Sequence, residues 1–315
     1  MSRLGTVVVL FALLVASVAG MIGLLRPSVF PLLGGRAEDP VASVRQDASA
    51  LGEEPSAGMP LPDGTTPGPT DQETPAPEEN EPAAYRLYVV LDDAGHDLGH
   101  LRAFVPFPGV FTVAVLPGLE FSRESLRMTI ALGHEAILHQ PMEAMGEHDP
   151  GPGAILTSHS DAEIRRTLVS NLASMPGVVG VNNHMGSRAT SDPRVMRTVA
   201  DTLTRYRLFF LDSRTTHLSI AAQVSRQVGL GTLERDVFLD NIRSEAAISA
   251  QLDAALEVAR RQGYAVLIGH VTSPELARVL ISRYSELQAA GFTFLPLSDL
   301  LERSAHRVTH ADTRN

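Results

Sequence analysis

The chain has 315 residues, no cysteine and a formal net charge of −10 at pH 7. Without cysteine it forms no disulfide, and any metal ion must be held by histidine, aspartate or glutamate. Residues 36–84 carry eleven acids against two arginines, a net charge of −9, whereas residues 85–315 carry 25 acids against 22 bases, a net charge of −3. The C-terminal part therefore has no basic field to attract nucleic acid, and we expect no nucleic-acid partner.

The first 30 residues are predicted to enter a membrane. From Leu4 to Leu25 there are 22 residues without a charge, enough for a helix that spans the hydrocarbon core. Length favours a transmembrane anchor, but the small residues at 16–20 would also suit a signal peptidase, so a cleaved signal segment stays open. Arg3 and Arg26 flank the segment almost symmetrically, so its orientation is not set by these charges.

Residues 31–84 are rich in proline, glycine, acidic and hydroxyl side chains. Such a composition buries too little apolar surface to offset the entropy lost on ordering. The segment is therefore predicted to be a disordered acidic linker that repels itself into an extended tether. A folded domain is expected at 85–303, and residues 304–315 are expected to form a disordered tail.

After Tyr85, short apolar runs alternate with amphipathic stretches, which is typical of βα units. Strands are predicted at 86–91, 110–116, 135–138, 178–182, 208–211, 264–269 and 292–296. Helices are predicted near 97–105, 121–132, 161–175, 193–206, 245–262 and 274–289. Two helix starts are well marked, by a capping box from Ser160 to Glu163 and by the pair Asp192-Pro193. This alternation predicts an α/β fold, a distorted or incomplete (β/α) barrel of about seven strands.

Polar residues interrupt this pattern at the carboxyl ends of the predicted strands. They are Asp92, Asp93, His139, Asn183, His184, Asp212 and His270. The strand ends of a (β/α) barrel open onto one face, so these side chains are expected to converge. Each has a plainer explanation on its own, because an aspartate can cap the next helix and a lone histidine is commonly a structural residue. Their shared location favours a functional site.

Several runs around these residues resemble a known family. Residues 91–95 (Leu-Asp-Asp-Ala-Gly) resemble the Asp-Asp-Gly motif of the polysaccharide deacetylase superfamily, and residues 133–143 resemble its Gly-His-Glu…His-x-x-x-His segment. The closer similarity is to the divergent polysaccharide deacetylase family of bacteria, through the runs at 138–143, 149–154, 181–187, 211–216 and 235–240. The resemblance covers roughly 87–300, and the order and spacing of several motifs make it specific.

The resemblance implies a distorted α/β barrel that holds a divalent metal, with Zn²⁺ the first choice. It implies Asp93 and His139 as metal ligands, Asp92 as general base and His270 as general acid. Where the family's usual second histidine would stand, this chain has Glu143. We therefore infer that His184 completes the metal site, with Glu143 as the alternative ligand or as a partner that orients an imidazole.

Three further polar residues are candidates for holding the substrate or orienting His270. They are Asn183, Asp212 and Arg214. A structural ion pair between Asp212 and Arg214 at the barrel rim is an equally good explanation for those two.

The predicted function is metal-dependent hydrolysis that removes an acyl group, chiefly N-acetyl, from a cell-envelope polysaccharide. The domain is expected to be periplasmic or otherwise extracytoplasmic, and either anchored to the inner membrane or secreted. The expected partners are the envelope glycan and, through the N-terminal segment, the membrane. Two alternatives stay open: a catalytically silent glycan-binding or scaffolding protein of the envelope, and a metal-dependent amidase or esterase that acts on its peptide or lipid parts.

Overall fold

The computed structural model describes residues 85–312, with side chains described from 85 to 304. The segments predicted as an anchor at 1–30 and a linker at 31–84 lie outside the described residues. Within 85–312, no helix combines the length and the apolar character needed to cross a membrane.

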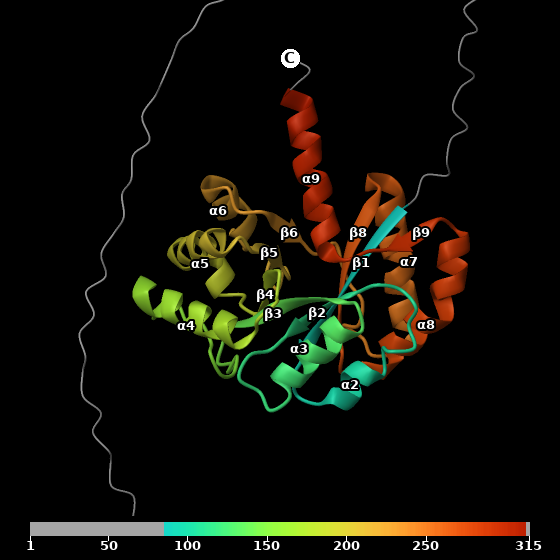
Figure 1. The fold of residues 1–315 in the computed structure, drawn as a ribbon, viewed down its shortest axis with the longest axis horizontal. Coiled ribbons are helices and arrows are strands. Elements are labelled where there is room, and N and C mark those ends of the chain that lie inside the picture. Colours follow the sequence, from blue (N-terminus) through green and yellow to red (C-terminus); the bar gives the residue numbers. More distant parts are fainter. Residues whose placement is uncertain (1–84, 313–315) are drawn as a thin grey trace, which may run out of the picture. The chain divides into compact units, whose positions relative to one another are not determined.

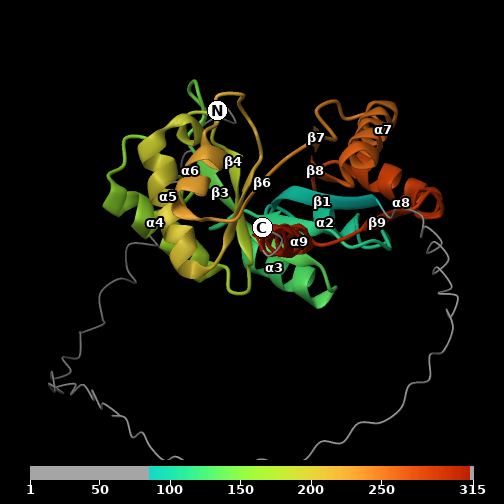
Figure 2. The same ribbon diagram turned by 90° about the horizontal axis from the view of Figure 1, so that it is seen from above.

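In the described part of the chain, nine strands form one curled sheet in which every pair of neighbours is parallel (Figures 1 and 2). They are β1 (Tyr85–Ala94), β2 (Thr112–Val115), β3 (Glu135–Met142), β4 (Gly180–Met185), β5 (Phe209–Asp212), β6 (Thr232–Glu234), β7 (Val237–Phe238), β8 (Tyr264–His270) and β9 (Phe292–Phe294). The order is β6-β5-β4-β3-β2-β1-β8-β7, and β9 pairs with the first residues of β1. The prediction of an incomplete (β/α) barrel is confirmed.

Helices surround the sheet in Figure 2. They are α2 (Leu98–Arg102), α3 (Ser122–Ala131), α4 (Asp161–Ser174), α5 (Pro193–Tyr206), α6 (Ala221–Val228), α7 (Glu245–Gln262), α8 (Pro274–Ala289) and α9 (Leu297–Asp312), with a 3-10 turn η1 (Ala189–Ser191). Helices α5, α7 and α8 have the predicted bounds. The capping box before α4 is present, and Asp192 caps α5 ahead of its first residue, Pro193.

The barrel has a seam between β6 and β7, the two ends of the strand order. The chain crosses this seam in two residues. The backbone N–H of Arg235 donates to the carbonyl of Asp212 at 3.1 Å, beside β6, and that of Asp236 donates to the carbonyl of Val266 at 2.9 Å, beside β7. The sequence did not predict β6, β7 or α6, because such short elements leave no sustained apolar period.

Side chains of the central strands alternate between two cores. In β1, Leu87, Val89 and Leu91 pack toward the surrounding helices. Tyr88 and Val90 face the other way, into an inner core inside the curled sheet. Strands buried on both faces are apolar almost continuously, and this alternation decides which residues reach the interior at the strand ends.

Helix α9 closes the amino-terminal end of the barrel. Its Leu297 and Leu300 belong to the inner core, and Tyr88 Oη donates to Asp299 Oδ2 at 2.7 Å. Figure 2 shows α9 end-on near the middle of the surrounding elements. Helix α9 continues to Asp312, past the boundary predicted at 303. The carboxyl ends of the strands are at the opposite end of the barrel.

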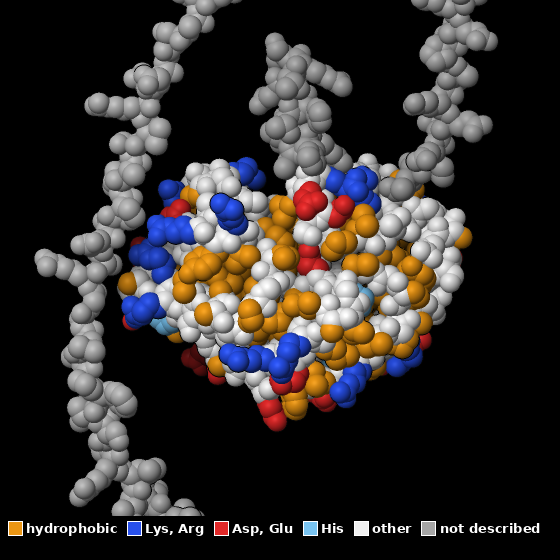
Figure 3. Space-filling view, in the orientation of Figure 1, with side chains coloured by type: hydrophobic (Ala, Val, Ile, Leu, Met, Phe, Trp, Pro, Cys, Tyr) orange, Lys and Arg blue, Asp and Glu red, His pale blue; other side chains and the backbone are white. Residues whose placement is uncertain are grey.

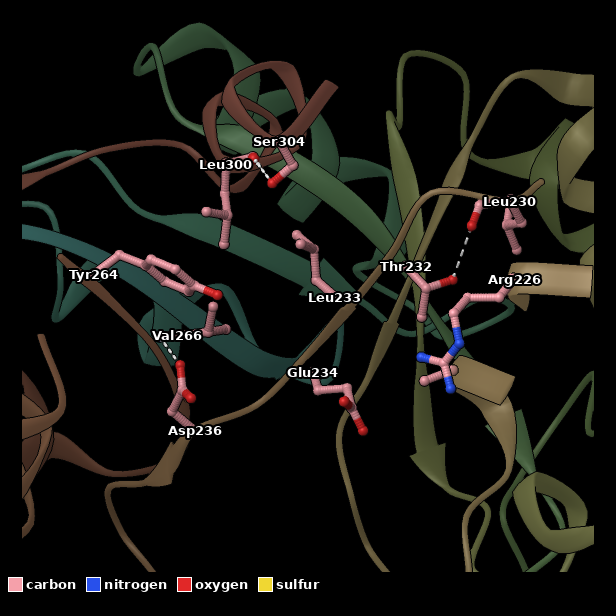
Figure 4. A pocket seen from close by; sticks show the side chains of 11 residues that line it. Arg226, Leu230, Thr232, Leu233, Glu234, Asp236, Tyr264, Val266, Leu300 and Ser304 are labelled. Atoms are coloured by element: carbon pink, nitrogen blue, oxygen red, sulfur yellow. Dashed lines mark hydrogen bonds between the residues drawn. The ribbon is translucent and has the colours of Figure 1, made fainter. Parts of the chain in front are cut away.

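A cavity of about 350 Å³ lies beside the seam, below α9 (Figure 4). Its lining includes Arg226, Thr232, Glu234, Asp236, Tyr264, Val266 and Leu300. On β8 the lining extends from Tyr264 to Val266, and the strand ends at His270, so at about 3.3 Å per residue the cavity begins roughly 13 Å from the carboxyl end of that strand. It is separate from the polar residues singled out in the sequence.

Candidate active site

Three possible metal ligands meet at the carboxyl ends of β1, β3 and β4. Asp93 Oδ1 lies 3.0 Å from His184 Nδ1 and 3.2 Å from His139 Nε2, and the two imidazole nitrogens are 3.1 Å apart. Ligand atoms held tetrahedrally about 2.0–2.1 Å from a zinc ion are about 3.3 Å from one another. Within the described residues, Asp93 Oδ1 is buried and accepts no hydrogen bond. These three residues therefore fit a divalent cation.

A backbone irregularity brings both members of the aspartate pair into the site. Asp92 has the same parity as Tyr88 and Val90 and so faces the interior. Asp93 would face the helices, but its φ is +66° and the pairing between β1 and β2 shifts register between Leu91 and Ala94. A bulge of this kind re-aims the side chain, and aspartate tolerates the left-handed region better than most residues.

Asn182 fixes the orientation of His139. Its Nδ2 donates to Asp92 Oδ1 at 2.8 Å, so its Oδ1 faces His139 Nδ1 at 2.7 Å. The Nδ1 proton of His139 is then committed to Asn182, which leaves Nε2 directed at Asp93 and available to a metal ion. A partner that sets the tautomer of a ligating imidazole in this way strengthens metal binding.

His270 approaches the same point from β8, the other neighbour of β1. Its Nε2 is 3.9 Å from Asp93 Oδ2. The buried carboxylate of Asp240 holds the residue twice, through Nδ1 at 3.0 Å and through the backbone N–H at 2.9 Å. Nδ1 is therefore occupied, and Nε2 is the nitrogen available for proton transfer.

The two adjacent carboxyl groups have opposite pKa shifts. Burial raises the pKa of Asp92 above its usual range, and the charge of Asp93 adds to that effect. Burial also acts to raise the pKa of Asp93, but the imidazoles of His139 and His184 outweigh it and hold that pKa well below its usual range. Two neighbouring carboxyl groups whose pKa values differ in this way can serve as one proton acceptor and one permanently ionised metal ligand.

Glu143 is not part of this cluster, contrary to the sequence-based alternative. Its Oε2 accepts hydrogen bonds from the backbone N–H and the hydroxyl of Thr157, at 2.5 and 2.6 Å. Its Oε1 pairs with Arg188 at 3.2 Å. Glu143 therefore joins two loops at the rim, and its oxygens have partners other than the imidazoles.

Asn183, Asp212 and Arg214 also have structural partners. Asn183 accepts from the backbone N–H of Ser213 and donates to the carbonyl of Met185. Asp212 accepts from the backbone of Arg214 and from the hydroxyl of Ser219, so it does not orient His270.

The alternative explanation, an ion pair between Asp212 and Arg214, is not seen among the described residues, where the Arg214 guanidinium pairs with Glu234 at 2.6 Å. The alternation of strands explains why two of these residues miss the site. Asn183 shares the parity of Val181, and Asp212 shares that of Phe210, both of which pack toward the helices.

Sequence reasoning missed Asn182 and Asp240 as site residues. Asn182 stands two residues before His184 and so shares its inward parity, which could have been used to find it. Asp240 follows β7, a strand of only two residues. Its one signal was its place at the end of the run 235–240.

An apolar hollow elsewhere in the described part of the domain lacks this chemistry. Its volume is about 270 Å³, and it is lined by residues at the ends of α4 and α5, including Val169, Leu172, Met175, Tyr206 and Leu208. No histidine or carboxylate lines it. Figure 3 shows arginine side chains mainly along the edge of the face in view and hydrophobic side chains nearer its middle. Neither this hollow nor the cavity beside the seam has a histidine in its lining, so the strand-end cluster is the candidate site.

The fold and this cluster define a barrel of the polysaccharide deacetylase type. The sequence pattern of the family described as divergent polysaccharide deacetylase matches residues 89–301, and the chain belongs to that family.

Two curated proteins are similar to this chain in sequence. The chain is similar to the uncharacterized protein YibQ of Escherichia coli, with 36% identity over 62% of this chain and 61% of the relative. It is 32% identical to an uncharacterized protein of Haemophilus influenzae, over 60% of this chain and 67% of that protein. The match spans about three fifths of the length of YibQ.

A solved structure has the same fold. The crystal structure of an uncharacterized protein from Agrobacterium tumefaciens superposes with a TM-score of 0.65. The match covers 69% of this chain and 89% of that one, at 21% identity.

Proposed function

We propose that residues 85–304 form a divalent-metal-dependent hydrolase that removes N-linked acyl groups, acetyl included, from a cell-envelope polysaccharide. The observation that carries the proposal is the triangle of Asp93, His139 and His184, with sides of 3.0 to 3.2 Å. A buried carboxyl, Asp92, and an oriented imidazole, His270, flank this triangle. Zn²⁺ is the proposed ion because nitrogen and carboxylate ligands suit it.

The reaction adds one water across the amide. A bound zinc ion would supply Lewis-acid chemistry, by polarising the carbonyl and lowering the pKa of the attacking water. Asp92, with its raised pKa, accepts the proton of that water as the new C–O bond forms. The pKa of His270 is also raised, because its pairing with Asp240 outweighs the effect of burial. The raised pKa favours the protonated form of His270, which donates to the departing amine nitrogen as the C–N bond breaks.

We further propose that the domain acts outside the cytoplasm, tethered to the membrane by residues 1–30 through the acidic linker at 31–84. The support is the run of 22 uncharged residues from Leu4 to Leu25, which is long enough to span a bilayer as a helix. The proposed substrate is also located in the envelope. Fractionation of cells that express the full chain tests this, since a cytosolic, membrane-free pool would contradict it.

The test of catalysis uses the full-length protein, loaded with Zn²⁺ and then freed of excess ion. We expect about one zinc ion per chain by mass spectrometry and acetate release from N-acetylglucosamine or N-acetylmuramic acid polymers. Asp93→Asn is expected to abolish both. Asp253→Asn, an exposed aspartate on α7, is the matched control and should change neither. Zinc retention without release of any acyl group would contradict the enzyme and favour a silent glycan-binding protein.

A further inference from the structure

A second pocket opens directly beside His184 at the same rim. Its volume is about 240 Å³. Most of its wall is leucine and proline, from Leu116, Pro117, Leu119, Pro141, Pro150 and Pro152. The exposed side chains of His96 and Asp149 lie at its edge. A group bound there would therefore contact mainly apolar surface next to the candidate metal ligand.

The loop at 149–153, which forms one wall of the pocket, is fixed by hydrogen bonds from β3 and α4. Gln140 Nε2 and Asn171 Nδ2 both donate to the carbonyl of Gly153, at 2.8 and 2.9 Å, and Asn171 also donates to Gln140 Oε1. A Cβ on Gly153 would lie 2.6 Å from Asn171 Oδ1, so a side chain there would disrupt this arrangement. The wall is preformed, which spares a ligand the cost of ordering it.

The strand order sets the direction of a substrate across the site. His270 lies on β8, and the pocket is formed by loops after β2 and β3, on the other side of β1. Asp93 at the end of β1 separates the two. If His270 protonates the leaving amine, as the proposed function requires, the acyl half of the amide lies on the pocket side.

The volume is larger than an acetyl group needs. At about 30 Å³ for each water-sized unit, 240 Å³ holds roughly eight such units. Acetyl would leave most of the apolar wall in contact with water. We infer that this pocket binds the acyl chain of the substrate and that chains of about six to eight carbons fit it best. This inference rests on the proposed function, and it names the acyl group that the site prefers.

The test compares glucosamine oligosaccharides that carry N-acetyl, N-butyryl, N-hexanoyl and N-octanoyl groups, with the full-length zinc-loaded protein. Water adds to the acyl carbon, so each substrate releases one free amine and one carboxylic acid. Each buried methylene can raise kcat/KM about fourfold, so the four extra methylenes of hexanoyl should raise kcat/KM over that for acetyl by roughly 250-fold. Leu119→Phe, which fills the pocket, should reduce the ratio of hexanoyl to acetyl rates at least tenfold. Leu218→Phe, at a side chain that is 51% exposed and lies outside this pocket, should leave that ratio unchanged.

A binding measurement separates this inference from the proposed function. Calorimetry with sodium acetate and sodium hexanoate, with and without Zn²⁺, should give tighter binding of hexanoate, and Leu119→Phe should remove that preference. Rates that are highest for acetyl and decline with chain length would overturn the inference and leave the hydrolase intact. If no substrate is hydrolysed, the proposed function fails, and equal binding of acetate and hexanoate would then overturn the pocket assignment as well.

Discussion

On one side of the barrel rim, the carboxylate of Asp93 lies between the imidazoles of His139 and His184; on the other side, the imidazole of His270 is held by the carboxylate of Asp240. The same two kinds of group are arranged in opposite ways. Imidazole nitrogens directed at one carboxylate oxygen present lone pairs to a cation. An imidazole with one nitrogen already bonded to a carboxylate has its other nitrogen free to transfer a proton. The two sides should therefore respond differently to mutation.

The largest effect on kcat that leaves zinc binding unchanged is expected on the His270 side. His270→Gln should lower kcat by about 10²–10⁴-fold, the usual contribution of a positioned acid, and should leave the zinc content unchanged. Asp240→Asn should have a smaller effect on kcat and should move the alkaline limb of the pH–rate profile to lower pH, because Asp240 raises the pKa of His270. Kinetics and metal analysis on the same preparations decide the matter. Loss of zinc in His270→Gln would contradict the assignment of metal binding to one side and proton transfer to the other.

On the metal side, among residues that contact a metal ligand without binding the ion, Asn182 is expected to have the largest effect on zinc affinity. Asn182→Ala removes the acceptor for His139 Nδ1, so the apparent zinc affinity should decrease by about 10–100-fold. The neighbouring Asn183→Ala is the matched control. It should lower thermal stability, because Asn183 bonds two backbone groups, with little change in zinc affinity. Competition with a chromogenic chelator measures the zinc affinity of both variants. Equal losses of zinc affinity in the two would contradict the role given to Asn182.

The sequence predicted the barrel and the convergence of Asp93, His139 and His184, because the carboxyl end of each long apolar strand can be recognised from the polar residue that follows the apolar run. It did not separate inward from outward residues at those ends. The alternation that places Tyr88, Val90 and Asp92 together also places Asn183 and Asp212 outside, and counting parity along each strand would have shown this.

Two other features could not be read from local pattern. The left-handed conformation of Asp93 reverses its parity, and this depends on the register between β1 and β2. Asp240 follows a strand too short to be recognised, and its position is set by tertiary pairing with β8. Tertiary contacts therefore set the positions of these two residues, which the periodicity of the sequence does not predict.

The metal side should also respond to pH. Burial lowers the pKa of His139, but the charges of Asp92 and Asp93 outweigh it and raise that pKa to about 9 in the metal-free protein. The unfolded value is about 6.5, so this imidazolium stabilises the metal-free fold below that pH, and the stabilisation is lost as pH rises through about 9.

Zinc requires the neutral ring and must displace this proton. Between pH 7 and 8.5 the apparent zinc affinity should therefore rise about tenfold per pH unit, with release of about one proton. Calorimetry in two buffers of different ionisation enthalpy measures that proton. An affinity independent of pH over this range would show that His139 is already neutral.

The smallest effect is expected far from both sides, at the start of α4. The Ser160 hydroxyl accepts from the backbone N–H of Glu163, and the Glu163 carboxylate accepts from the backbone N–H of Ser160 in return. Ser160→Ala should cost about 1 kcal/mol of unfolding free energy, which for a domain of this size lowers Tm by about 2–4 °C. The matched control is Ser158→Ala, at an exposed serine before the cap. Because α4 contributes no side chain to the metal triangle or to the His270–Asp240 pair, zinc affinity and kcat should remain at the wild-type values. A change in either would mean that the rim is coupled to the outer helices and that its two sides are not independent of the scaffold.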